Sequence, residues 1–291
     1  MLHLGLAQGL VPEDPDQLTP AVARQIAALG VTRITTHFDV PPGSLAGSRG
    51  REIAALLADA GIRIAQCAGL SPNLISPDAA VRAASIADLA ELMRSAQSLG
   101  AQMVLSGCGS FHPTFPYGPA RENHAPETRL RLTESIRELA RHAEEAGIPM
   151  TLECHLLTTL DTPEHVREIF DAVDSPFANA NFDPVNFVGS LDAVWASGAV
   201  AEHAARTIGP RLAPSIHIKD LVVEPDLVLK IAEVPPGTGI MDLDAVIESC
   251  RYLPDDSSLI VEHFGPEESE AALRYVAVLA ERHGMLSAAR S

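Results

Sequence analysis

Aromatic residues and long apolar runs are both scarce in this chain. Phe, Trp and Tyr make up 4% of its 291 residues, while hydrophobic residues as a whole make up 46%. An aliphatic core of this kind suits packed layers of strands and helices better than a β-sandwich. No apolar run reaches the ~18 residues of a membrane-spanning helix, and no secretory signal pattern opens the chain. We therefore expect a soluble, cytoplasmic protein without a membrane partner.

Cysteine is equally sparse. The four residues of this type, Cys67, Cys108, Cys154 and Cys250, are widely spaced and include no Cys-x-x-Cys pair. That spacing argues against a disulfide framework and against a zinc knuckle. Most of them fall in or beside apolar runs, where cysteine usually behaves as a small buried hydrophobe. We expect free, buried thiols.

Positive charge is the third shortage. The chain holds 21 Lys and Arg against 38 Asp and Glu, which gives a formal net charge of −17. A surface of this charge repels phosphate backbones, so no nucleic-acid partner is expected. Only two residues are lysines, Lys219 and Lys230, so a lysine near a candidate site would be informative.

Short apolar runs alternate with longer segments along the whole chain. These runs are apolar at nearly every position, as is typical of parallel strands that are covered on both faces. The expected strands are His3–Ala7, Arg33–His37, Ile62–Ala68, Met103–Ser106, Met150–Cys154, Ala178–Asp183, Ser215–Ile218 and Leu259–Glu262.

The segments between these strands carry apolar residues at helical spacing, most clearly over Ala83–Leu99 and Leu130–Ala146. Thr162-Pro163-Glu164 predicts the start of another helix. The length of 291 residues is close to the ~250 typical of one (β/α)8 barrel. We predict that residues 1–291 form a single α/β domain, a (β/α)8 TIM barrel. A doubly wound open sheet is the alternative, but the glycine-rich turn typical of that fold does not follow the first strand.

Four ionisable residues end four successive expected strands: Glu153, Asp183, His217 and Glu262. In a (β/α)8 barrel these strand ends converge on the active site. A single carboxylate in such a place is more often a helix cap or a salt-bridge partner, but four matching positions favour a metal site. Three carboxylates and an imidazole would repel one another and lose hydration unless a cation joined them. The oxygen-rich set suits Mn²⁺ or Mg²⁺ and leaves Zn²⁺ open.

The motifs around these residues resemble those of the xylose-isomerase-like TIM-barrel superfamily, which includes the sugar phosphate isomerase/epimerase family. The motifs are Leu-Glu-x-His at 152–155, Phe-Asp-Pro-x-Asn at 182–186, His-x-Lys-Asp at 217–220 and Val-Glu-His at 261–263. The resemblance covers essentially the whole chain. It is specific for the fold and the metal site, and it does not choose a substrate.

The resemblance implies that Glu153, Asp183, His217 and Glu262 bind the metal. It also implies that Glu153 and Glu262 are catalytic and move a proton on opposite faces of a small carbohydrate. A divalent ion on a carbonyl and its neighbouring hydroxyl would acidify the C–H between them and stabilise the enediolate. The expected activity is that of a sugar or sugar-phosphate isomerase or epimerase. Barrels of this group commonly pair, as a homodimer or homotetramer.

Three alternatives remain. His155 lies two residues after Glu153, which resembles 3-dehydroshikimate dehydratases, where the matching histidine takes part in proton transfer. A lyase acting on a cyclic keto-polyol is therefore the second hypothesis. The plain alternative is that His155 is a structural histidine. An endonuclease IV-like nuclease is disfavoured, since Asn186 replaces a ligand histidine and the net charge is acidic. A non-catalytic sugar-binding barrel is the third, and intact metal ligands argue against it.

The expected substrate contacts are His112, Asn186, Lys219, Asp220 and His37. For Lys219, a contact with a substrate oxygen or phosphate competes with a salt bridge to Asp220. For His37, a histidine satisfied within the core or rim is the simpler interpretation. His112 resembles an endonuclease IV histidine, and here a substrate contact is favoured over a second-metal ligand.

Two further segments and one histidine complete these expectations. The Pro-rich and aromatic segment Phe111–His124 is long for a loop and could act as a lid. The Gly-x-Gly-x-x-Asp run within Pro235–Asp242 is weak evidence for a phosphate cradle, because it also describes a plain entry from loop to helix. We expect His263 to point away from the barrel mouth.

Overall fold

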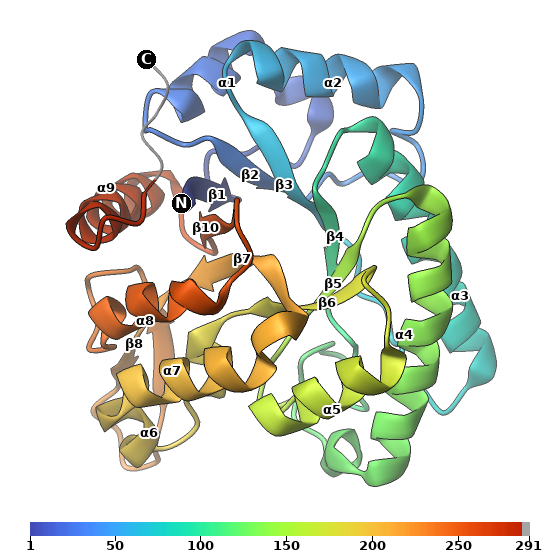
Figure 1. Cartoon of the computed structure of the whole chain (residues 1–291), viewed down its shortest axis with the longest axis vertical. Coiled ribbons are helices and arrows are strands. Elements are labelled where there is room, and N and C mark those ends of the chain that lie inside the picture. Colours follow the sequence, from blue (N-terminus) through green and yellow to red (C-terminus); the bar gives the residue numbers. More distant parts are fainter. Residues whose placement is uncertain (287–291) are drawn as a thin grey trace.

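Eight parallel strands close into a barrel in the computed structural model, which describes residues 1–286 (Figure 1). Their order around the ring follows their order in the sequence, and this confirms the predicted (β/α)8 architecture. The barrel strands are β1 (His3–Ala7), β2 (Arg33–Thr36), β3 (Arg63–Cys67), β4 (Met103–Ser106), β5 (Met150–Glu153), β6 (Ala178–Phe182), β7 (Leu212–Ile218) and β10 (Ser258–Val261).

Helices surround the barrel on its outer side (Figure 1). The two helices predicted most clearly are present, and each begins four residues earlier than expected. The side chain of Asp78 caps the first of them by accepting the N–H of Ala80, and Pro126 occupies the first turn of the second. The helices are α1 (Pro20–Ala27), α2 (Ser48–Asp59), α3 (Ala79–Ser98), α4 (Pro126–Ala146), α5 (Pro163–Val173), α6 (Leu191–Trp195), α7 (Ser197–Ile208), α8 (Leu243–Ser249) and α9 (Pro266–Arg282).

A small antiparallel hairpin interrupts the last repeat, and the sequence analysis did not predict it. Strands β8 (Asp220–Val223) and β9 (Ile231–Val234) pair with each other between β7 and α8. The tip of the hairpin lies in solvent, and Leu227 there is fully exposed. Each of the two strands has four residues, and β9 is only partly buried.

The inward faces of several strands carry polar residues at a spacing of two, because successive side chains of a strand point to opposite sides. On β7 this places Ser215 and His217 on the barrel axis, and Lys219 follows them towards the mouth. Ile260 of β10 lies beside Gly5 of β1, where a Cβ atom would collide with the Ile260 side chain.

Two expectations from composition can be compared with the structure. All four cysteines lie within the described residues and are free and buried, as predicted. Within residues 1–286, none of the helices combines the length and apolar character that a membrane crossing requires.

Candidate metal centre

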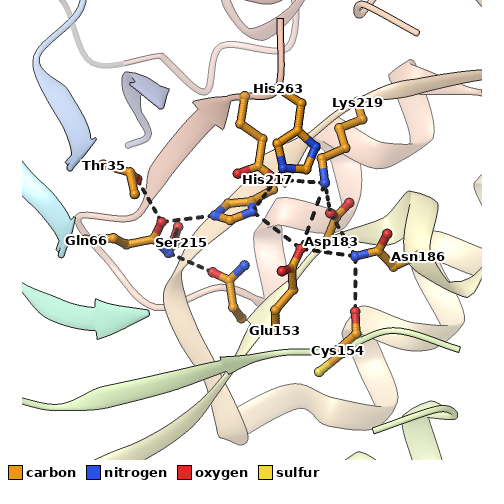
Figure 2. Close-up of polar contacts among 12 residues, drawn as sticks. Thr35, Gln66, Glu153, Cys154, Asp183, Asn186, Ser215, His217, Lys219 and His263 are labelled. Carbon is orange, nitrogen blue, oxygen red and sulfur yellow. Dashed lines mark hydrogen bonds and ion pairs between the residues drawn. The ribbon is translucent and has the colours of Figure 1, made fainter. Parts of the chain in front are cut away.

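The four predicted ligands meet at the mouth of the barrel. Glu153 ends β5, His217 lies near the end of β7, and Asp183 and Glu262 directly follow β6 and β10. One potential ligand atom from each residue falls within 4.8 Å of the others. Asp183, His217 and Glu262 are buried, and Glu153 is partly open to the cavity. Figure 2 shows Glu153, Asp183 and His217 pointing toward one another.

Asp183 Oδ1 is a buried oxygen without a hydrogen-bond partner among the described residues. His217 Nδ1 and Glu262 Oε1 lie 2.8 Å from each other, and Glu262 Oε1 also lies 2.7 Å from Lys219 Nζ. An unsatisfied buried polar group costs about 1–3 kcal/mol, so the free oxygen of Asp183 needs an explanation. Two carboxylate oxygens and one imidazole nitrogen form a donor set that fits a divalent cation.

A hydrogen-bonded glutamine orients the imidazole for metal binding. The amide nitrogen of Gln66 donates to Asn181 Oδ1 at 2.8 Å and to Ser215 Oγ at 3.0 Å. The amide oxygen therefore faces the histidine; it accepts from Thr35 Oγ1 at 2.8 Å and lies 3.0 Å from His217 Nε2 (Figure 2). The Nε2 atom must carry the proton to donate in this contact, which leaves the Nδ1 lone pair for a cation.

The electrostatics of the cluster show a shortage of positive charge. Burial raises the pKa of the Asp183 carboxyl to about 7 against the opposing effect of Lys219. Burial alone would lower the pKa of His217, but the Glu262 carboxylate outweighs it and raises that pKa. Both shifts favour protons in the cluster, and a bound cation would replace them.

Lys219 provides a positive charge within this cluster. Its Nζ lies 2.6 Å from Asp183 Oδ2 (Figure 2). The same atom lies 2.7 Å from Glu262 Oε1. Burial alone would lower the pKa of Lys219, but these two carboxylates and Glu153 raise it well above its usual value. The alternative salt bridge to Asp220 was wrong, because strand alternation directs Asp220 to the other side of the chain.

Asp220 organises a loop, and the predicted substrate contact at this residue is therefore corrected. Its carboxylate accepts backbone N–H groups of Leu221, Gly237, Gly239 and Met241 at 2.8–3.1 Å. Gly239 is required there because a Cβ atom would collide with the Asp220 carboxylate. The Gly-x-Gly segment is thus occupied by a side chain of this protein, which supports the plain loop-to-helix interpretation.

A cavity of about 640 Å³ opens above the metal ligands. Three of the predicted substrate contacts line it, His37, Asn186 and Lys219, together with His155. His112 is not among the lining residues, so the cavity gives no support to the predicted contact at that residue. Its ring Nδ1 accepts the backbone N–H groups of Thr114 and Phe115 and so holds the turn of its own loop.

Three lining residues were missed or misplaced by the sequence analysis. Tyr117 donates its hydroxyl to Glu153 Oε2 at 2.9 Å, and Glu233 of β9 borders the cavity. The expectation that His263 points away was wrong. Its backbone has a φ of 71°, which breaks the strand alternation and places its Nδ1 3.0 Å from Glu233 Oε1. Only the unusual aromatic content of the Phe111–His124 segment could have indicated Tyr117.

The fold agrees with the comparisons to known proteins. Residues 23–281 match the family described as xylose isomerase-like TIM barrel. Because this match spans most of the chain, the protein belongs to that family, as the sequence motifs predicted.

Individual relatives are more distant. The 3-oxo-isoapionate decarboxylase of Pectobacterium atrosepticum is 27% identical over 207 residues, which are 66% of this chain and 72% of that protein. A D-psicose 3-epimerase crystallised with D-fructose superposes with a TM-score of 0.71 at 18% identity, over 96% of this chain and 99% of the other. A xylose isomerase-like barrel from Mycobacterium smegmatis in complex with magnesium gives a TM-score of 0.68 at 21% identity, over 96% and 98%. At these identities the two structures establish a shared fold.

Proposed function

We propose that the protein is a divalent-metal-dependent isomerase or epimerase of a small, unphosphorylated sugar. The observation that carries this proposal is the cluster of three carboxylates and one imidazole from four strand ends, with Glu153 and Glu262 lining an open cavity and the buried Asp183 Oδ1 without a partner among the described residues. Mn²⁺ or Mg²⁺ is the preferred metal because carboxylate oxygens dominate the set. A bound ion would polarise a carbonyl oxygen and acidify the neighbouring C–H bond.

Glu153 is the best-placed base in the cavity. It is the most exposed of the four ligands, at 14% of its side chain, and therefore the most accessible to a substrate. Tyr117 donates to its Oε2, and Asn186 donates to its Oε1 at 3.2 Å. These contacts fix the orientation of the carboxylate, which would take a proton from the carbon next to the carbonyl.

Glu262 is the partner expected to act on the opposite face. It follows β10, which is separated from β5 by β6 and β7 around the ring, so the two carboxylates approach the centre from different directions. Burial alone would raise the pKa of Glu262, but His217 and Lys219 hold it well below its usual range. The Glu262 carboxylate is therefore ionised and free to accept a proton, but its low pKa means that it holds the proton weakly.

The other lining residues suit hydroxyl groups. Burial lowers the pKa of both His37 and His155, which keeps their rings neutral near pH 7 and able to donate or accept hydrogen bonds. Within the described lining, Lys219 is the one lysine, no arginine contributes, and Glu13, Asp39 and Glu233 add negative charge. This balance disfavours a phosphate dianion and favours an uncharged sugar.

Solvent exchange tests the proposal directly. The protein is incubated with Mn²⁺ in D2O together with a panel of free ketoses, and NMR measures deuterium at the carbon beside the carbonyl. We expect exchange with at least one ketose and its loss in Glu153→Gln, whereas the exposed-site control Lys230→Met keeps the wild-type rate. Absence of exchange across the panel, with Mn²⁺ shown to be bound, would reject the isomerase proposal.

A lyase is the second candidate, and two observations favour it. The curated relative is a decarboxylase, and His155 lines the cavity beside Glu153. In a decarboxylation, the electrons of the C–C bond would move onto the ketone as an enediolate, CO2 would leave, and one proton would return to carbon. Only one proton donor is needed, so the low pKa of Glu262 is no obstacle. Release of CO2 from a β-keto sugar acid, without exchange into ketoses, would select this candidate. A cyclic keto-polyol that yields a conjugated product would instead indicate a dehydratase.

A further inference from the structure

Lys219 is a buried ammonium group among the proposed metal ligands. Its side chain comes from the residue after β7, and the residue is 3% exposed. Besides Asp183 and Glu262, its Nζ lies 3.9 Å from Glu153 Oε1. Burying a charge is unfavourable unless oppositely charged groups surround it, and here three of the four metal ligands do so.

The contacts of Asp183 separate its two oxygens into different roles. Oδ2 receives Lys219 Nζ at 2.6 Å and Asn186 Nδ2 at 2.9 Å. Oδ1 has no hydrogen-bond partner within residues 1–286. Lys219 therefore occupies one oxygen and leaves the other for a cation, so the carboxylate is held in position whether or not a metal is bound.

The net charge of the cluster points to a second role for Lys219, besides holding Asp183 in position. Glu153, Asp183 and Glu262 bring three negative charges, His217 is neutral when its Nδ1 lone pair faces a metal, and Lys219 brings one positive charge. The set then carries two negative charges, which one divalent ion would neutralise.

We propose that Lys219 is a resident counter-cation of the metal site. It holds the ligand side chains together before the metal arrives, matches their charge to that of one divalent ion, and lowers the affinity for that ion by repulsion. This inference rests on the metal site of the proposed function, but it does not depend on which reaction the site performs.

Two opposing effects decide what removal of this charge would do. Loss of a bond that orients a ligand typically weakens metal binding 10–100-fold. Loss of a positive charge within a few ångströms of a divalent ion strengthens binding, and in a buried site this effect is the larger because little solvent screens it. We therefore expect Lys219→Met to bind Mn²⁺ at least ~10-fold more tightly than the wild type, and to be less stable when metal-free.

Calorimetric titration of chelator-treated protein with Mn²⁺, together with thermal unfolding with and without Mn²⁺, tests the inference. Lys219→Met should show a lower metal-free Tm, a lower Kd and a larger rise in Tm on Mn²⁺ addition. Lys219→Arg keeps the charge and should stay near the wild type. Lys230→Met is the matched control, because Lys230 is exposed on the hairpin and pairs with Glu224.

The outcomes separate the two proposals. A Kd in Lys219→Met equal to or above that of the wild type would overturn the counter-cation role while leaving the metal site intact. A wild-type protein that binds no Mn²⁺, Mg²⁺ or Zn²⁺ would overturn both proposals. If metal-free Lys219→Met does not fold, the variant is purified with Mn²⁺, and release to a chelator is timed. Slower release than from the wild type supports the inference, and equal or faster release rejects it.

Discussion

At the N-terminal ends of the strands, Arg33 and His3 both contact Asp256. Arg33 donates to Oδ1 of this carboxylate at 3.2 Å, and His3 Nε2 lies 2.5 Å from the same oxygen. Gln102 donates to Oδ2 at 3.3 Å. The charged groups at this end therefore neutralise one another with side chains of the protein itself.

The opposite end of the same barrel is arranged differently. Three carboxylates meet one buried ammonium group and one imidazole, so negative charge is in excess there. The difference matches the division of labour typical of this fold, in which the C-terminal face carries catalysis and the N-terminal face carries stability. Charged residues occur at both ends of the barrel, but at the C-terminal end the negative charges outnumber the positive ones. An excess of one charge therefore marks the functional end better than the presence of charge does.

Replacement of a ligand should have the largest effect. In Asp183→Asn we expect Mn²⁺ affinity to fall by more than ~100-fold, since loss of a direct ligand exceeds the 10–100-fold effect of an outer partner. Metal-dependent turnover should be lost with it. Calorimetry measures the affinity, and thermal unfolding shows whether the metal-free fold survives. Wild-type affinity in this variant would remove Asp183 from the metal site.

Gln66 should give the next largest effect. Gln66→Leu deprives His217 Nε2, Thr35, Asn181 and Ser215 of their shared partner, so we expect a 10–100-fold weaker Mn²⁺ affinity and a loss of about 1–3 kcal/mol in the free energy of unfolding. Gln102→Leu at the other end of the barrel is the control and should leave the metal affinity unchanged. Equal affinities in the two variants would mean that Gln66 does not orient the imidazole.

The metal ligands could be predicted from the sequence because each one marks the end of a strand. Glu153, Asp183, His217 and Glu262 follow apolar runs that are recognisable on their own, and barrel closure brings such ends together. Lys219 lies two residues after His217, so strand alternation also placed it on the inner side. Where local periodicity decides the position of a side chain, the predicted position agrees with the structure.

The remaining contacts depend on interactions that have no local signature. Gln66 lies in the middle of a strand, and its role depends on four partners from other strands. His112 and Asp220 are polar residues at plausible places, but each is occupied by backbone N–H groups of its own loop. His263 was misplaced because a residue with positive φ reverses the alternation, and a non-glycine residue gives no warning of this.

The excess negative charge of the metal-site cluster should appear in the pH dependence of metal binding. The pKa of Asp183 is raised from 3.8 to about 7 in the folded protein. A raised pKa stabilises the metal-free fold below pH ~4, and this contribution is lost as the pH rises toward 7. Metal must displace this proton and the proton favoured on His217, whose pKa is also raised, so Mn²⁺ affinity should rise by about tenfold or more per pH unit between pH 5 and 7.

Calorimetry in buffers of different ionisation enthalpy checks this. At pH 6 at least one proton should be released per Mn²⁺, because the pKa values of both Asp183 and His217 are raised. The rise in Tm on Mn²⁺ addition should grow over the same interval. Affinity that is constant between pH 5 and 7 would mean that the Asp183 carboxylate already carries its charge without the metal.

The smallest effect is expected at the N-terminal end of the barrel, where Asp256 pairs with Arg33 and His3. Asp256 is 55% exposed, so solvent screens its ion pairs, and we expect Asp256→Asn to lower the free energy of unfolding by at most ~1 kcal/mol at pH 7. Burial would raise the pKa of this carboxyl, but the hydrogen bond from His3 and the charge of Arg33 lower it overall. The stabilisation is therefore present above the usual pKa and is lost as the pH falls through the lowered value. Denaturant unfolding at pH 7 and pH 3 measures the difference, which should shrink at the lower pH. Because the charges at this end already neutralise one another, Mn²⁺ affinity should be unchanged in Asp256→Asn. A change in affinity of more than about twofold would show that the two ends of the barrel are not independent.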